Sequence, residues 1–163
     1  NLPWVDMSYE KLSSEYVLHP LMTAVSTLTV NNGSDTYTFD IGTKETATTN
    51  EDGEESTTTT TSVMYGDSEI NSSYFSTFFQ NLTLLKKSDT SSDKPSGKAV
   101  FTAEYKYTDG STDTVKFYDA GGNKYLAEVN GISVGHLYKT NPSKLIEQVK
   151  TVANNKEVSD FAI

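Results

Sequence analysis

The chain has 163 residues, a length typical of a single domain with its own hydrophobic core. It carries 22 acidic and 13 basic residues, for a formal net charge of −9, and every base is a lysine. Nucleic acid and anionic lipid attract positive charge, and phosphate is often held by the arginine fork, so this composition argues against both partners. Because cysteine is absent, disulfides, thiolate metal sites and a cysteine nucleophile are excluded.

The composition also bears on location. Threonine, serine, asparagine, glycine and tyrosine are abundant, which favours an extracytoplasmic surface when combined with the acidic balance. No apolar run reaches the roughly 18 to 20 residues that a bilayer span needs, and no signal-peptide pattern opens the chain. Because the chain starts abruptly at Asn1, we expect a targeting segment upstream of it, outside this sequence.

The first predicted elements are two strands joined by a tight turn. Leu28 and Val30 alternate with threonines, and after the turn "NNGSD" the residues Tyr37, Phe39 and Ile41 alternate with polar ones. Such alternation is typical of strands with one buried face, and Asn and Gly supply the positive φ that hairpin turns need. This segment is therefore predicted to form a hairpin.

The next segment, residues 42–62, reads "GTKETATTNEDGEESTTTTTS" and has almost no apolar side chain. Five consecutive threonines follow a cluster of acids. Because so polar a segment buries little surface, we predict an exposed, mobile loop. The acids could gather divalent ions weakly, but a solvated loop is the favoured interpretation.

Two amphipathic helices are predicted, at residues 71–87 and 141–155. Candidate N-caps are Asn71 or the two serines after it in the first helix, and Asn141 in the second. The apolar stripes, at helical spacing, consist of Tyr74, Phe75, Phe78, Phe79, Leu82 and Leu85 in the first helix and of Leu145, Ile146, Val149, Val152 and Ala153 in the second.

Between these helices the pattern returns to strands. The apolar face that holds Phe101 and Tyr105 continues with Phe117 after a turn at Asp109-Gly110. The acids of "DGSTD" lack the order of a calcium loop, so they predict only a turn. The glycines of "AGGN" and "NG" lie between strands and not before a helix, so they predict hairpin turns and not a phosphate-binding loop.

The element order suggests an internal repeat. Strands followed by a helix occur once in residues 20–88 and again in residues 97–156, with the polar stretch "SDKPSG" between them. We therefore predict one globular region over residues 1–163, of the α+β class. It should consist of two similar units, each a small antiparallel sheet with one packed helix. Whether the units share one sheet is left open.

His136 is the first candidate binding residue. Strand alternation places it with Ile132, Val134 and Tyr138 on an apolar face, unless Gly135 shifts the register. A general base or metal ligand is the functional interpretation. A half-buried structural histidine, hydrogen-bonded to the backbone, is the favoured one.

Tyr118 is the second candidate, because it is predicted on the face opposite the apolar one. Tyr105 and Tyr125 are predicted on the apolar face, and exposed rings could bind carbohydrate or peptide. The other histidine, His19, is predicted in a turn. Two histidines without cysteine make a poor zinc site, so we expect no metal and no cofactor.

Several segments carry a family resemblance. In order they read "VLHPL…LTV…YTFDI", then "YFSTFFQNLTLL", then "DGSTDTVKFYD" and "KYLAEVNGISVGHLYKTNPSKLIEQVKTV". This order resembles the bacterial domain of unknown function 4340 family over most of the chain. The resemblance implies an N-terminal membrane anchor, extracytoplasmic α+β units and, for some members, association with ABC-type transport or gliding-type systems. It implies no catalytic residues.

The function we expect is a non-enzymatic, membrane-anchored domain of the cell envelope. No nucleophile-elbow, zinc-protease or phosphate-loop motif is present, which favours scaffolding or binding of an envelope protein, in connection with a transport system. The alternative is a surface module that binds glycan or peptide through exposed aromatic rings. A hydrolase with paired carboxylates is a third, less favoured hypothesis.

Overall fold

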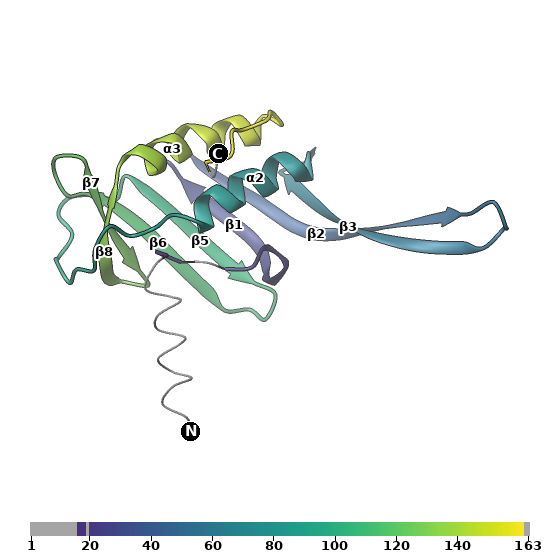
Figure 1. Ribbon diagram of the computed structural model, residues 1–163, viewed down its shortest axis with the longest axis horizontal. Coiled ribbons are helices and arrows are strands. Elements are labelled where there is room, and N and C mark those ends of the chain that lie inside the picture. Colours follow the sequence, from purple (N-terminus) through teal and green to yellow (C-terminus); the bar gives the residue numbers. More distant parts are fainter. Residues whose placement is uncertain (1–15, 19, 162–163) are drawn as a thin grey trace, which may run out of the picture.

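The structure is a computed structural model that describes residues 16–18 and 20–161 of the chain (Figure 1). Three segments form the helical part: the 3-10 turn η1 (Met22–Ala24) and the α-helices α2 (Ser72–Thr83) and α3 (Thr140–Ala153). The strands are β1 (Val25–Asn31), β2 (Thr36–Thr49), β3 (Glu55–Tyr65), β4 (Ser68–Ile70), β5 (Phe101–Tyr107), β6 (Thr112–Asp119), β7 (Lys124–Val129) and β8 (Ile132–Tyr138).

The eight strands form one antiparallel sheet in the order β4-β3-β2-β1-β5-β6-β7-β8. Its centre is the pair β1–β5, where Leu28 faces Tyr105 and Val30 faces Ala103. The α+β class is thus confirmed, and the question left open by the sequence is answered by one continuous sheet. The physical reason is that β1 and β5 carry matching apolar faces, and each would leave an open edge if it stayed unpaired.

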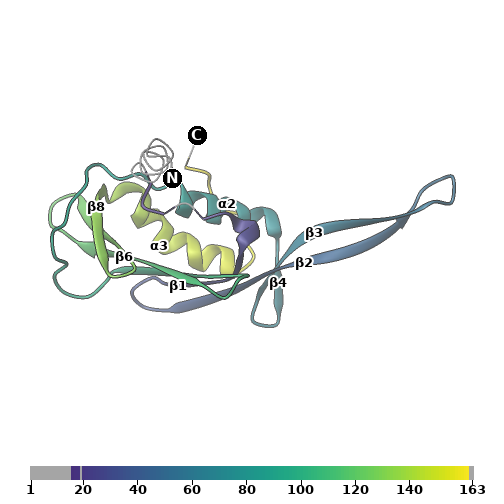
Figure 2. The ribbon, with the colours of Figure 1, turned by 90° about the horizontal axis from the view of Figure 1, so that it is seen from below.

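Both α-helices cover the same face of the sheet (Figure 2). On α2 the buried rings Phe75, Phe78 and Phe79 recur at helical spacing, and Phe75 lies 5.1 Å from Phe39 of β2 between ring centroids. Burial of large aromatic side chains is worth several kcal/mol each and dominates this core. The predicted apolar stripe of α2 therefore points to the sheet, as expected.

The helix starts agree with the sequence in one case and not in the other. Asn71 caps α2, since its side chain accepts hydrogen bonds from the N–H groups of Ser73 and Tyr74. The cap predicted at Asn141 is wrong, because α3 begins at Thr140 and Lys139 precedes it. Strand β8 ends at Tyr138 and α3 begins at Thr140, so only Lys139 separates the strand from the first turn of the helix.

A buried asparagine joins the two helices to the C-terminal segment. Asn81 of α2 donates to Gln148 Oε1 of α3 at 3.0 Å and to the Ser159 carbonyl at 2.8 Å. Its own side-chain oxygen accepts the N–H of Phe161 at 3.0 Å. All of its hydrogen-bonding groups thus have partners, as a side chain that is only 3% exposed requires.

The segment predicted as a mobile loop is a paired structure instead. Residues 42–49 continue β2, residues 55–62 begin β3, and the register runs unbroken from Gly42 opposite Ser62 to Thr49 opposite Glu55. This hairpin, called the arm below, projects from the body of the molecule (Figures 1 and 2). The prediction of exposure is confirmed, but the loop is wrong: threonine is β-branched and favours strands even where little is buried.

A long connection, residues 84–100 and called the linker below, leads from α2 to β5. It passes along β8, where Ser88 N–H donates to the His136 carbonyl at 2.7 Å. The approach is so close that a Cβ atom on Gly135 would overlap the Asp89 carbonyl. Glycine at position 135 is therefore required by close backbone contact.

Candidate binding sites

The position of His136 depends on an irregularity in β8. Ala127 pairs with Gly135, but its neighbour Glu128 pairs with Ser133, so Val134 is an extra residue on β8. This bulge turns Gly135 and Leu137 to the core and His136 to the other face. The register shift that the sequence allowed at Gly135 is therefore present, and it takes His136 off the apolar face.

The outer face of the sheet brings the two predicted residues together. Tyr118 pairs with Leu126, and Leu126 pairs with His136, so the three side chains lie in a row across β6, β7 and β8. Linker residues Asp93 to Ser96 lie across this row and close a hollow of about 370 Å³, called the outer pocket below. Leu126 forms its floor and is 3% exposed.

The imidazole of His136 is held between two carboxylates of the linker. Its Nδ1 atom lies 3.0 Å from Asp89 Oδ1, and its Nε2 atom lies 3.5 Å from Asp93 Oδ2. A histidine that activates a nucleophile needs one nitrogen toward a carboxylate and the other toward the nucleophile. Here both nitrogens face acids, and the structural interpretation of His136 is favoured over a general base.

The hydrogen bond from the His136 ring, followed by that from its backbone N–H, lowers the pKa of Asp89 below its ordinary value, and Lys124 adds to this effect. Asp89 and Asp93 were not singled out in the sequence, since they lie in a polar stretch without a motif. Nothing in the residue pattern could have indicated their contact with a strand 40 or more positions away.

Tyr118 lies on the outer face, as predicted, and is half-buried at the pocket. Burial raises its pKa, and the carboxylate of Glu128 adds to the rise. Tyr105 and Tyr125, however, are buried in the core. Among the described residues that line the outer pocket, Tyr118 thus supplies the one phenol ring, beside the imidazole of His136.

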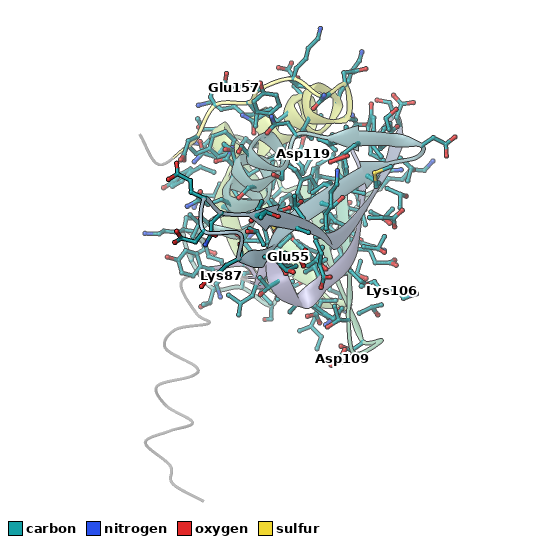
Figure 3. All side chains as sticks on the ribbon, turned by 90° about the vertical axis from the view of Figure 1, so that its right-hand side faces the viewer. Glu55, Lys87, Lys106, Asp109, Asp119 and Glu157 are labelled. Atoms are coloured by element: carbon teal, nitrogen blue, oxygen red, sulfur yellow. The ribbon has the colours of Figure 1, made fainter. Side chains whose placement is uncertain are left out.

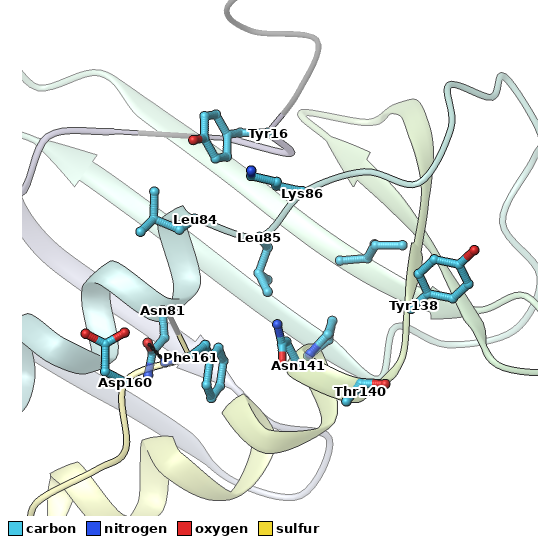
Figure 4. A pocket seen from close by; sticks show the side chains of 12 residues that line it. Tyr16, Asn81, Leu84, Leu85, Lys86, Tyr138, Thr140, Asn141, Asp160 and Phe161 are labelled. Atoms are coloured by element: carbon cyan, nitrogen blue, oxygen red, sulfur yellow. Dashed lines mark hydrogen bonds between the residues drawn. The ribbon is translucent and has the colours of Figure 1, made fainter. Parts of the chain in front are cut away.

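A larger hollow of about 600 Å³ lies where the end of α2 meets the start of α3 (Figure 4). Leu84, Leu85 and Phe161 supply apolar walls, and Asn141 and Lys86 supply polar ones. Among the described residues, no buried side-chain nitrogen or oxygen lacks a hydrogen-bond partner. Unsatisfied buried polar atoms among the described residues therefore give no sign of a ligand at this hollow.

The arm offers a third kind of surface. Every residue from 42 to 61 is exposed, on both faces of the ribbon. Its sequence holds five acidic residues and one lysine, with the acids gathered toward the tip, where Glu55 lies. Figure 3 views the molecule from the side on which the arm projects. The run of threonines favours a strand, because threonine is β-branched. The acidic residues next to it favour a loop, so the sequence alone did not indicate the strand.

In residues 16–18 and 20–161, no group of three or more His, Asp or Glu side chains is placed to hold a metal ion. Over the same residues, no helix combines the length and the apolar character needed to cross a bilayer. His19 lies outside the described residues.

The fold defines an α+β domain with one eight-stranded sheet, a helical layer on one face and a projecting arm. Comparison with family models, with curated proteins and with solved structures gave no match.

Proposed function

We propose that this chain is a non-enzymatic, protein-binding domain of the cell envelope and that the arm makes its main contact with a partner. The main observation behind this proposal is that residues 42–49 and 55–61 are paired into a ribbon although every one of them is exposed. An isolated two-stranded hairpin is only marginally stable in water. A partner surface would bury this ribbon and order it further.

The arm adds little to the core of the domain. The buried residues of β2 and β3 are Tyr37, Phe39 and Val63, all at the base of the ribbon. Beyond them the strands hold together through cross-strand pairs such as Thr46 opposite Thr58, which contribute about 0.2–1 kcal/mol each. So long an extension without a packing role is suited to intermolecular contact.

The cellular location of the domain is part of the same proposal. An extracytoplasmic position, an anchor upstream of this sequence and a link to an ABC-type transport system are supported by the composition and by the resemblance to the domain of unknown function 4340 family. A two-unit repeat is also part of the proposal. It is supported by the element order, since β1–β4 are followed by α2 and β5–β8 by α3.

The test uses position-specific photo-crosslinking of the full-length protein in its own cells. A photoreactive amino acid replaces Ala47 or Thr60 on the arm and, as a control, Lys106 on the exposed surface of β5. We expect the same partner to be captured from both arm positions and not from Lys106. Capture from Lys106 alone, or from none of the three positions, would contradict the proposal.

A deletion provides a second measurement. Replacing residues 43–61 by a two-residue Asn-Gly turn should abolish capture from a reporter placed at Gly42, while the body of the domain keeps its thermal unfolding temperature within a few degrees. If capture persists without the arm, the binding surface lies elsewhere.

The outer pocket supports a second candidate function, the binding of a glycan or peptide, because Tyr118 and His136 line the same hollow. Titration of short oligosaccharides and peptides, followed by amide chemical shifts of β6 to β8, tests this hypothesis. A response that is lost in Tyr118→Ala would favour it over the arm. A hydrolase that uses His136 as its general base is less favoured, because both nitrogens of the ring face carboxylates.

A further inference from the structure

The edge of β3 within the arm is open. The hydrogen bond from Asn50 N–H to the Glu54 carbonyl, 2.9 Å, closes the hairpin and sets the alternation of the ladder. In an antiparallel pair, residues alternate between facing their partner and pointing their N–H and C=O groups away from it. From the register, Ser56, Thr58 and Thr60 face β2. The other residues of this stretch point outward.

The outward residues are Glu55, Thr57, Thr59 and Thr61. Beyond them the same edge is occupied, because Val63 pairs with Ile70 of β4 and Tyr65 pairs with Ser68. β4 is only three residues long, so it leaves residues 55–62 uncovered. The edge therefore presents a row of backbone donors and acceptors that no described strand fills.

Natural edge strands are usually blunted by charge, proline or a bulge. Residues 56–62 contain no charged residue and no proline, and their register with β2 shows no shift. The opposite edge, on β2, does carry charges, at Lys44 and Glu45. The β3 edge is thus the more receptive of the two.

The charges around this edge indicate the chemistry of an occupant. Glu54 and Glu55 lie at its tip end. At its other end a hollow of about 450 Å³ is lined by Thr61 and Glu69, among others, but Lys44 Nζ lies 4.0 Å from Glu69 Oε2 and offsets that charge. The acids at the tip would attract lysine or arginine and would repel the equally acidic arm of a second copy.

We infer that the β3 edge of the arm, at Thr57, Thr59 and Thr61, binds one extended strand of a basic partner protein by β-strand addition. This inference rests on the proposed function and states how the arm recognises its partner. Backbone hydrogen bonds supply the affinity in this mode, and side chains supply the selectivity. The incoming strand is expected to place a basic side chain near Glu54 and Glu55 at the tip.

The test uses the full chain labelled with ¹⁵N and a ten-residue probe peptide with lysine at both ends and alternating threonine and valine between them. We expect the amides of Thr57, Thr59 and Thr61 to shift and to exchange more slowly when the peptide is added. The inward amides of Thr58 and Thr60 should change less. Thr59→Pro removes one outward N–H and should weaken binding up to about tenfold.

A matched variant separates the backbone from the side chain. Thr59→Val keeps the N–H and the shape of the side chain but loses the hydroxyl, so it should bind the peptide like the unmodified chain. Equal weakening in Thr59→Val and Thr59→Pro would overturn the inference. A peptide with glutamate in place of lysine should bind more weakly; equal binding would overturn the basic character of the partner.

Three further outcomes also overturn the inference. They are no response of the outward amides at millimolar peptide, a response confined to the outer pocket, and a dimer of the chain that Thr59→Pro dissociates. In each of these cases the photo-crosslinks at Ala47 and Thr60 test the proposed function independently of the peptide experiment. If they persist while the peptide test fails, the arm still binds a partner, but not by strand addition.

Discussion

The Nδ1 atom of His136 lies 3.0 Å from Oδ1 of Asp89, and this contact fastens the linker to the last strand of the sheet. The same carboxylate oxygen accepts the backbone N–H of His136 at 3.0 Å. Ser88 N–H donates to the His136 carbonyl. Since no strand among the described residues pairs with the far side of β8, the linker covers an edge that would otherwise be open to pairing.

The first prediction concerns acid. The pKa of Asp89 is lowered in the folded chain, so its carboxylate stabilises the fold above its ordinary pKa of about 4 and loses this effect as the pH falls through the lower folded value. We expect residues 88–93 to lose amide protection in that pH range before the core does. Hydrogen exchange followed by NMR measures this. In Asp89→Asn this pH-dependent loss of amide protection should be absent. A carboxyl of Asp89 that titrates at its ordinary pKa would contradict the prediction.

The second prediction compares two glycines. Gly135→Ala should destabilise the domain by about 1–3 kcal/mol, because the new methyl group would overlap the Asp89 carbonyl and push the linker from β8. Gly42→Ala is the matched control in another strand, where nothing lies within 4 Å of an added Cβ. Chemical denaturation gives both free energies of unfolding. Equal free energies of unfolding for the two variants would contradict the prediction, because they would show that the linker moves away from β8 without destabilising the domain.

The third prediction concerns Asn81. Asn81→Leu leaves the N–H of Phe161 without its partner and removes one of the two donors to the Ser159 carbonyl, which keeps Gln148 Nε2, so it should cost about 2 kcal/mol. Gln80→Leu, at the exposed neighbouring position on α2, should change stability by less than about 0.5 kcal/mol. Urea denaturation monitored by circular dichroism gives both values. A neutral Asn81→Leu would mean that the C-terminal segment does not depend on this side chain.

The fourth prediction concerns a hydroxyl between β5 and β6. Tyr107 Oη donates to Asp113 Oδ2 at 2.7 Å, and Asn130 Nδ2 donates to the other oxygen at 2.8 Å. Tyr107→Phe should cost about 1–2 kcal/mol, measured by thermal denaturation against Tyr65→Phe.

The same hydroxyl should respond to base. Burial, and then its bond to Asp113, raise the pKa of Tyr107. Its contribution to stability is therefore complete below its ordinary pKa of about 10 and declines as the pH rises beyond it. Ultraviolet titration of the phenol in the unmodified chain and in Tyr107→Phe tests this. The difference between the two titrations reports the Tyr107 phenol. If that phenol titrates at its ordinary pKa, the prediction is contradicted.

Local patterns were informative wherever a residue interacts with its near neighbours. The alternation at Leu28, Val30 and Phe39, the turn at Gly110 and the cap at Asn71 all follow from spacing within a few residues. The same local view failed for residues 42–62. Polarity was taken as a sign of a loop, although the strand preference of threonine and the pairing with β2 were enough to form a ribbon.

Sites made by distant residues were beyond local patterns. Tyr118 was predicted on the outer face and lies there, but its place beside His136 depends on strand register and on the bulge at Val134. The contacts of His136 with Asp89 and Asp93 depend on the path of the linker. None of these features leaves a trace in the spacing of single residues.

The sequence by itself determined the α+β class, the two apolar helix stripes, most of the turns and the acidic character of the surface, because these depend on periodicity, turn chemistry and composition. Only the tertiary structure decided that β1 and β5 join the halves into one sheet, that the linker covers β8, and that the arm has an open edge. The physical reason is that strand pairing is a contact between segments far apart in the chain, whose partners are selected by the packing of the whole domain.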